Sequence, residues 1–385
     1  MLKVVVGHSN DPDSDSAIAE ILEQSDQDLA GNSPQAGILM AAMEFDHALM
    51  LKQIHLAYPN IDLIGGTSTG EMSSVLQFQQ DSATLMLFCS DEIDIRAGIA
   101  RNLSQDTIAA TASAINQART DKRPRLCLTL SESIGVNGGA VAQGLQQAVG
   151  EGVTVFGGMT GDNNQFQFTY QFFRTEVVQD AAPILLFSGD LLVSCAVATG
   201  QFPVSKQGVA TKTMEQSILE IDGRPAAEFF FDYFGEIFLG GGGAIGGSLA
   251  VFEPSGRNFY LRSPSGNDPE TGAVHFFGEV PEQSIIQLTR TNESHILSGA
   301  EIALKAAKSQ YPGTSPAAAF IVSCASRLKI IGVQSAKEYQ IVQTILGRDL
   351  PNIGFYAFGE ISPFSSGETT YFHNETFSAV LMGTK

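Results

Sequence analysis

The sequence predicts an α/β protein of two domains, built from repeated strand-helix-strand-strand units whose mixed or mainly antiparallel sheets are covered by helices. The chain has 385 residues, and a single hydrophobic core rarely grows beyond about 250–300 residues, so two domains are expected. The same order of apolar strand, periodic helix and glycine-ended strand also occurs three times. We expect a first domain over residues 1–205 and a second over residues 206–385.

The first repeated unit begins near Gly37. An apolar run of strand length is followed by apolar residues at helical spacing, and Pro59 ends that helix. A second short strand ends in glycines just before Glu71. The segments 83–89 and 93–100 then predict two further strands joined by a turn.

Two later regions repeat this order. The corresponding segments are 126–133, 140–150, 153–164, 183–189 and 191–200 in the second unit, and 320–327, 338–347, 351–364 and 376–383 in the third. We expect the join between the domains over residues 201–220. The region after it predicts an aromatic-rich helix over 226–238, a glycine run from Gly240 to Gly247, and strands over 258–264, 273–280 and 284–291.

A glycine followed by an acidic residue recurs just beyond a strand end in each unit, and the acids are Glu71, Asp162 and Glu360. Ligands of α/β sheets prefer the carboxyl ends of strands, and each carboxylate could accept a hydrogen bond from a ligand ammonium group. Ser68 and Tyr356 add hydroxyl groups nearby. The alternative is that the acids only cap the amides of turns.

The last third of the chain offers a denser polar set. Its members are Arg262, Ser263, Arg327, His373, Asn374 and Thr376. Arg327 could clamp a carboxylate with two parallel hydrogen bonds, and Glu360 opposite it would suit the ammonium of a zwitterion such as an amino acid. The alternative is an Arg327–Glu360 ion pair that only ties two strands together. The predicted ligand site consists of this polar set together with the residues of the glycine-acid motifs, which are Ser68, Glu71, Asp162, Tyr356 and Glu360.

Charge and cysteine content exclude several other functions. Lys and Arg number 22 against 41 Asp and Glu, a net charge of -19. Nucleic acid and anionic membranes both require a basic face, so neither is an expected partner. The four cysteines form no CxxC pair, which predicts reduced thiols and a cytoplasmic protein without a zinc site. We also expect no signal peptide and no membrane span.

Two motifs suggest nucleophilic or nucleotide chemistry. Gly66-Thr67-Ser68-Thr69-Gly70 fits the GxSxG elbow of serine hydrolases, but little room remains for the helix that must follow the serine. The glycine run from Gly240 lacks the Gly-Lys-Ser/Thr ending of a phosphate loop, so nucleotide binding is not expected.

Several motifs resemble those of the FIST (F-box and intracellular signal transduction) family. The segments EIDGRPAAEFFFDYFG, YLRSP, SCASR, GFYAFGEISPF and FHNETFSAVL resemble the FIST C domain, and PNIDLIGGTSTGEMSS with VTVFGGMTGDN resembles FIST N. The resemblance implies a bacterial-type sensory protein that binds amino acids or similar metabolites and does no chemistry of its own. In this family the output domain is often a fused kinase or cyclase. Here we expect the output to act in trans, through a separate protein such as a kinase or cyclase.

The resemblance also implies one cofactor, because some FIST proteins are linked to haem-based nitric oxide sensing. Haem needs an axial ligand such as histidine. The candidates are His8, His275 and His373, although no CxxCH motif or paired-histidine spacing is present. Our expectation is therefore a protein without a cofactor, with haem as the alternative. A scaffold that binds a partner through its phenylalanines is a further alternative, although core packing is their more common role.

Overall fold

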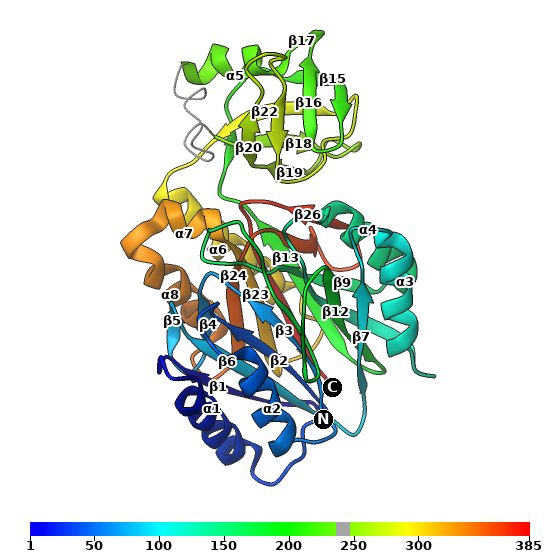
Figure 1. Cartoon of the computed structure of the whole chain (residues 1–385), viewed down its shortest axis with the longest axis vertical. Helices are drawn as coiled ribbons and strands as arrows, with labels where there is room; N and C mark the ends of the chain where they lie inside the picture. The colour runs from blue at the N-terminus through cyan, green and yellow to red at the C-terminus, as the bar shows by residue number, and fades with distance from the viewer. Residues whose placement is uncertain (236–246) are drawn as a thin grey trace.

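The computed structural model describes residues 1–235 and 247–385. Within these residues the chain forms three six-stranded sheets, which make up a body, and a nine-stranded sheet, which makes up a smaller lobe. Figure 1 shows the lobe standing on one end of the body, with the two termini close together at the other end. The predicted class, a mixed α/β protein in two parts built from repeated units, is confirmed.

The body consists of three units of the same order. The first holds β1 (Lys3–Ser9), α1 (Ser14–Leu29), β2 (Ala36–Ala41), α2 (His47–Ala57), β3 (Asp62–Thr67), β4 (Glu71–Ser73), β5 (Gln77–Gln79) and β6 (Ala83–Cys89). The second holds β7 (Asp94–Arg101), α3 (Thr107–Ala118), β8 (Pro124–Ser131), α4 (Gly138–Val149), β9 (Thr154–Met159), β10 (Gln171–Phe173), β11 (Glu176–Val178) and β12 (Ala181–Ser188). The third holds β13 (Leu192–Ala198), α6 (Glu293–Ser309), β23 (Ala318–Cys324), α7 (Ala325–Ile331), α8 (Ser335–Leu346), β24 (Asn352–Ala357), β25 (Glu360–Pro363), β26 (Thr370–His373) and β27 (Phe377–Gly383).

Strand pairing is equivalent in the three sheets. Their orders are β1-β6-β2-β3-β10-β11, β7-β12-β8-β9-β25-β26 and β13-β27-β23-β24-β4-β5. In each, the middle pair is parallel and the other pairs are antiparallel. The last two strands of each sheet come from another unit, so β4–β5, β10–β11 and β25–β26 are hairpins that the units exchange in a cycle. The glycine-acid motifs lie where the chain crosses from one sheet to the next.

Glycines permit close approach of neighbouring strands at these crossings. A Cβ atom on Gly65 would lie 2.1 Å from the carbonyl oxygen of Leu39, and one on Gly157 would lie 1.9 Å from that of Thr129. Both contacts are far inside van der Waals distance, so only glycine fits. The two positions are equivalent in the first and second parallel strand pairs. The repetition of this glycine therefore has a packing cause.

The main core lies between the inner faces of the three sheets. It unites residues from all three, including Ile38, Leu128 and Phe320, each at most 1% exposed. The outer faces are covered by contacting helix pairs, α1 with α2, α3 with α4, and α6 with α8 (Figure 1). These pairs bury the alternating apolar residues of the outer faces.

The lobe is an insertion between β13 and α6. It contains β14 (Phe202–Pro203), β15 (Gly208–Met214), β16 (Ser217–Ile221), β17 (Arg224–Pro225), α5 (Ala226–Phe234), β18 (Leu249–Phe252), β19 (Phe259–Arg262), β20 (Pro264–Asn267), β21 (Val274–Phe276) and β22 (Ile285–Arg290). It has its own core, which includes Phe230, Phe276 and Leu288. The predicted aromatic-rich helix is confirmed in α5. The glycine run, apart from Gly247, lies outside the described residues.

Three sequence interpretations differ from the structure. The segment 201–220, expected as a join, forms strands β14 to β16 of the lobe. The strands β6 and β7, expected as a pair, belong to different sheets, because the boundary between units falls between them. Helices α1, α3 and α6 were not predicted. Each covers the outer face of a sheet. Each also begins after an Asp or Asn cap, a signal that lies outside the repeated strand-helix-strand-strand pattern.

The division of the chain between residues 205 and 206 stays a prediction. In the structure, strands from the two sides of this division pair with one another. β13 lies beside β27, and β4 lies beside β24. Among the described residues, no helix is long and apolar enough to cross a membrane.

Candidate ligand pocket and its surroundings

A cavity large enough for a small molecule lies where the lobe meets the body. We call it the neck pocket; its volume is about 490 Å³. Its walls are Asn164, Phe166, Ser263, Pro264, Ser265, Phe277, Cys324, Ala325, Ser326, Lys329, Ala357, Phe358 and Asn374. The residues between 263 and 277 belong to the lobe, and all the other wall residues belong to the body. The pocket lies at the carboxyl ends of β23 and β24, the edge at which a ligand was expected.

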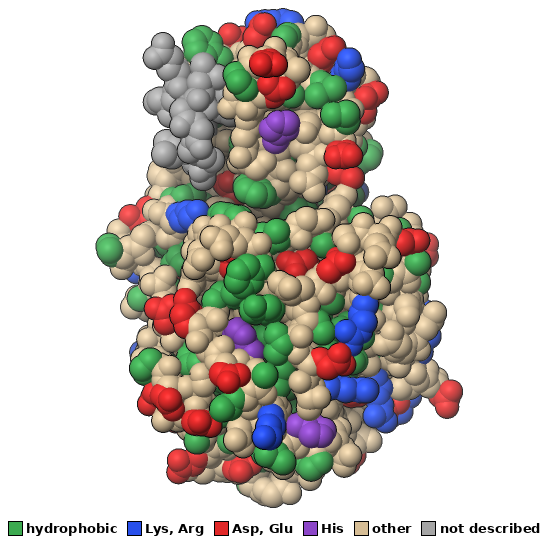
Figure 2. Space-filling model, in the orientation of Figure 1, with side chains coloured by type: hydrophobic (Ala, Val, Ile, Leu, Met, Phe, Trp, Pro, Cys, Tyr) green, Lys and Arg blue, Asp and Glu red, His purple; other side chains and the backbone are tan. Residues whose placement is uncertain are grey.

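Three phenylalanines from separate parts of the chain stack beside the neck pocket. The ring of Phe166 lies 4.5 Å from that of Phe358 and 5.6 Å from that of Phe277, centre to centre, and both pairs are nearly parallel. The ammonium of Lys329 lies 5.6 Å from the centre of the Phe166 ring. Phe166 therefore joins the lobe to the body and gives the pocket an aromatic wall next to a cation. Figure 2 shows apolar side chains gathered on the face of the body below the lobe.

Asp162 fixes the loop that carries Phe166. Its carboxylate accepts hydrogen bonds from the backbone N–H groups of residues 165–168, at 2.7–3.4 Å. Asn163, Asn164 and Phe166 have φ values of 54–62°, in the left-handed region that a phenylalanine rarely adopts. Asp162 thus caps turn amides, as the alternative interpretation holds. By doing so it places Phe166 at the pocket.

The turn between β26 and β27 connects the body to the lobe. Asn374 accepts a hydrogen bond from the backbone N–H of Ser263 at 3.3 Å. Glu375, which is buried and has a φ of 57°, accepts a hydrogen bond from the Ser263 hydroxyl at 2.6 Å and others from Ser248 and Gln201. The structure therefore brings together the predicted residues Ser263 and Asn374. Glu375 was missed, although it lies inside the FHNETF motif.

Glu360 lies behind the pocket wall and is fully buried. Its Oε2 accepts hydrogen bonds from the N–H and hydroxyl of Thr376, at 3.0 and 2.6 Å. Its Oε1 has no hydrogen-bond partner within the described residues. Burial raises the pKa of Glu360 to about 8, against the hydrogen bonds from Thr376. Burial also raises the pKa of the neighbouring Cys324 thiol, which stays protonated.

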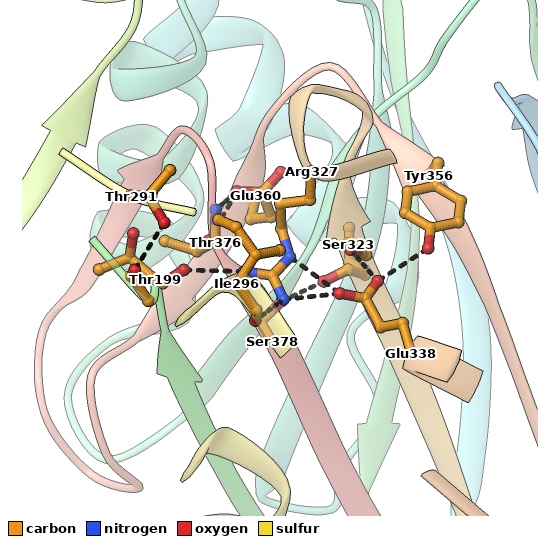
Figure 3. A network of polar contacts seen from close by, with 12 residues as sticks. Thr199, Thr291, Ile296, Ser323, Arg327, Glu338, Tyr356, Glu360, Thr376 and Ser378 are labelled. Atoms are coloured by element: carbon orange, nitrogen blue, oxygen red, sulfur yellow. Dashed lines mark hydrogen bonds and ion pairs between the residues drawn. The ribbon is translucent and has the colours of Figure 1, made fainter. Parts of the chain in front are cut away.

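Arg327 is ion-paired with Glu338 and not with Glu360, so the predicted clamp and the alternative Arg327–Glu360 ion pair are both wrong. The strand ends at Cys324, and Arg327 lies on α7, where it pairs with Glu338 of α8 at 2.6 Å. Both side chains are fully buried. The guanidinium also donates to the carbonyls of Thr199 and Ile296, each at 2.8 Å, so it is occupied within the protein (Figure 3).

Three other predicted residues are also engaged internally. Tyr356 donates to Glu338 at 2.8 Å. Arg262 donates to the backbone carbonyls of Leu261, Glu279 and Phe372, and burial lowers its pKa to about 10. The Nε2 of His373 lies 2.9 Å from the carbonyl of Ser362. These side chains support the neck from within rather than line its larger pocket.

Ser68 and Glu71 belong to a separate buried network in the first unit. Glu71 accepts hydrogen bonds from Ser68 and from Ser82, and Ser82 is bonded in turn to His8. Burial raises the pKa of Glu71 to about 7. A hydrolase elbow needs an exposed serine followed by a helix, whereas Ser68 is fully buried and β4 follows it. The GxSxG motif is therefore not an elbow.

The histidines considered as haem ligands lie in three different sheets. His8 is in β1 and fully buried, His275 is in β21 beside Ser217, and His373 is in β26. In the part of the chain that is described, no three His, Cys, Asp or Glu side chains are grouped to hold a metal ion. The expectation of no cofactor and its alternative, haem, both stay untested predictions.

Lys329, Phe166, Phe277 and Phe358 were the functional candidates that sequence reasoning missed. Two of them lie in or beside motifs that carried the family resemblance, since Phe358 belongs to GFYAFGEISPF and Lys329 follows SCASR by two positions. Their position at those motifs was a usable signal. Phe166 and Phe277 gave none, because their role depends on the lobe lying against the body.

Comparison with known proteins supports the resemblance noted in the sequence. The model of the FIST N domain matches residues 35–224, and that of the FIST C domain matches residues 226–363. No curated protein matches the chain. FIST domains are associated with signal transduction and with the sensing of small ligands.

Among solved structures, two cyanuric acid hydrolases are similar in outline. One, described as an "evolutionary innovation by structural concatenation", is 9% identical with a TM-score of 0.40, and the match covers all of both chains. The other, from A. caulinodans, is 10% identical with a TM-score of 0.38, covering 100% of this chain and 99% of that one. Similarity this low supports no conclusion about activity. Because the two domain models together account for most of its length, the chain belongs to the FIST family.

Proposed function

We propose that this FIST protein binds a small metabolite with a carboxylate group, such as an amino acid, in the neck pocket and passes the bound state to a partner protein. The observation that carries the proposal is the pocket itself, which joins apolar ring faces, amide and hydroxyl groups and one cation in about 490 Å³. Small-molecule sites in proteins are typically about 300–1,000 Å³ and have this mixture of groups.

Lys329 is the residue best suited to a ligand carboxylate. It is the one charged side chain among the residues that line the described pocket, and the protein around it carries a net charge of -19. The hydroxyl groups of Ser265 and Ser326 could accept hydrogen bonds from a ligand ammonium. Lys329 thus takes the part that the sequence had suggested for Arg327.

Signalling would follow from the position of the pocket between the lobe and the body. A ligand there would contact Ser263 and Phe277 of the lobe together with Phe358 and Asn374 of the body. A ligand can shift a conformational equilibrium only through different contacts in the two states, and a site shared by two moving parts provides such a difference. The output protein, a kinase or cyclase in our proposal, would respond to the position of the lobe.

A thermal-shift screen of amino acids and other carboxylate metabolites tests the proposal, because a ligand that prefers the folded state raises the melting temperature. For any compound that does so, Lys329→Gln should weaken binding about tenfold, roughly 1.4 kcal/mol. Lys337→Gln is the matched control, since Lys337 is also exposed but lies on α8, away from the pocket. Equal affinity in the wild type and Lys329→Gln would contradict the site.

A further inference from the structure

A second, smaller cavity lies at the other side of the turn between β26 and β27. We call it the hinge pocket; its volume is about 270 Å³. Part of its wall is residues 197–202, where the chain passes from the body into the lobe. Asn374 lines the neck pocket, whereas its neighbours His373 and Thr376 line the hinge pocket. The two cavities therefore share one turn but not one wall.

The hinge pocket is mainly apolar. The side chains that make it so are Val197, Ala198, Phe259, Leu261, Ile302 and Phe364. Arg257 and Asn258 also line it. A cavity of this kind favours a small ligand that is mostly hydrocarbon, because burial of its apolar surface supplies the binding energy.

Two residues that line this pocket, His373 and Thr199, each have a buried polar atom without a hydrogen-bond partner in the described part of the chain. The Nε2 of His373 lies 2.9 Å from the carbonyl oxygen of Ser362, and a carbonyl can only accept, so Nε2 carries the proton. In a neutral ring Nδ1 is then an acceptor, and burial lowers the pKa of His373 to about 4, which keeps the ring neutral at pH 7. Within the described residues, neither His373 Nδ1 nor the hydroxyl of Thr199, another wall residue, has a hydrogen-bond partner.

An unpartnered buried acceptor destabilises the folded protein, and native proteins usually satisfy such atoms with water or a ligand. We propose that the hinge pocket is a second ligand site, which takes a small apolar molecule carrying one hydrogen-bond donor, such as a phenol or an N–H heterocycle, and that His373 Nδ1 accepts this hydrogen bond. Because the pocket wall includes residues 199–202, such a ligand contacts the connection on which the lobe stands. The site is independent of the proposed carboxylate ligand.

Indole and benzofuran form a matched pair of probes for this site. They have nearly the same size and shape, but only indole has an N–H donor. Calorimetric titration of the full-length protein should show that indole binds at least ten times more tightly than benzofuran. In an ¹⁵N spectrum, the Nδ1 resonance of His373 should shift on addition of indole and not on addition of benzofuran.

Three variants complete the test. His373→Phe should abolish the preference for indole. Ile302→Trp, at a position that is 57% exposed on α6, should fill the pocket and exclude both probes without disturbing the core. Lys329→Gln, which alters only the neck pocket, should leave indole affinity unchanged.

Equal affinity of the wild type for the two probes would overturn the proposal, and so would a preference for indole that persists in His373→Phe. If His373→Phe does not fold, the His373 resonance and the Ile302→Trp variant decide. Indole binding that Ile302→Trp leaves intact, or that does not move the Nδ1 resonance, would place the ligand elsewhere and refute the site.

Discussion

The first and third units place the same residue at the same point of the repeat, yet the two carboxylates have different surroundings. Glu71 and Glu360 each begin the hairpin that crosses to another sheet, and both are fully buried. Both oxygens of Glu71 accept hydrogen bonds from serine hydroxyls. Glu360 has one oxygen bonded to Thr376 and the other without a partner among the described residues.

The difference follows from what covers each crossing. The first crossing is closed by Ser82 and His8 of its own sheet. The third crossing lies next to the lobe, which the other units lack. Two pockets are found there instead of a closed polar network. The lobe is present in one of the three similar units, and there the carboxylate lies at the border of a candidate binding site, whereas in the first unit it lies in a closed network.

The largest expected effect tests whether Glu360 depends on Arg327. Arg327→Met should lower the free energy of unfolding by about 3–5 kcal/mol, because it leaves the charge of Glu338 buried and unpaired. Adding Glu338→Leu should recover a large part of this loss, whereas adding Glu360→Gln should recover none. Urea unfolding of the single and double variants measures both. Recovery by Glu360→Gln would mean that Arg327 supports Glu360 after all.

The free energy of unfolding should depend on pH through the carboxyl groups of Glu71 and Glu360. Burial raises the pKa of Glu71 to about 7 and that of Glu360 to about 8, from an ordinary value of 4.5. The folded protein therefore holds more protons than the unfolded chain above pH 4.5. The stabilisation is complete below that pH and is lost as pH rises through 7 and 8. Burial lowers the pKa of His8 to about 3 and of His373 to about 4, so their opposite effect acts mainly at pH values below about 7.

Between pH 6.5 and 8.5 the effect of the two carboxyls outweighs the remaining opposite effect of the two histidines, which in the unfolded chain are still about half protonated at pH 6.5. We expect the free energy of unfolding to fall by about 2 kcal/mol over this range, since one pKa unit corresponds to about 1.4 kcal/mol. Calorimetric melting at several pH values checks this. The double variant Glu71→Gln/Glu360→Gln should lose most of this fall, and a wild-type stability that rises over the range would contradict the prediction.

Replacing Glu71 or Glu360 singly by glutamine should lower the free energy of unfolding by different amounts. Glu71→Gln should cost about 1–2 kcal/mol at pH 7, because an amide group must replace an oxygen that accepts a serine hydroxyl. Glu360→Gln should cost less than about 1 kcal/mol, since the amide oxygen can keep the bonds to Thr376 and the new NH₂ group occupies the position that had no partner. Chemical unfolding of both variants gives the comparison. Equal losses would show that the two sites are equivalent in energy despite their geometry.

The acid of the second unit should give the smallest effect. Asp162→Asn should cost about 1 kcal/mol, because the amide nitrogen can no longer accept from two of the four backbone N–H groups. Hydrogen exchange should then become faster at residues 165–168. Asp190→Asn, in an exposed turn, is the control and should change neither quantity. Unchanged exchange in Asp162→Asn would mean that the loop does not depend on its cap.

The sequence by itself determined the repeated α/β units, the glycines of the parallel strand pairs and the acids that follow them. These features depend on local patterns, since strand period, helix period and the close approach at Gly65 are properties of neighbouring residues. The same reasoning placed Ser263 and Asn374 in one polar set. Both line the neck pocket.

Only the tertiary structure decided which side chains remain available to a ligand. Three hairpins cross to another sheet, and this exchange depends on contacts between segments that are far apart in the chain. The strand ends at Cys324 instead of at Arg327, so Arg327 lies on the first turn of α7, which directs it to Glu338 instead of Glu360. Phe166 and Phe277 meet because the lobe rests on the body. A polar side chain in a sequence has a type but no partner, and the partner, fixed by long-range packing, decides whether it supports the fold or faces a cavity.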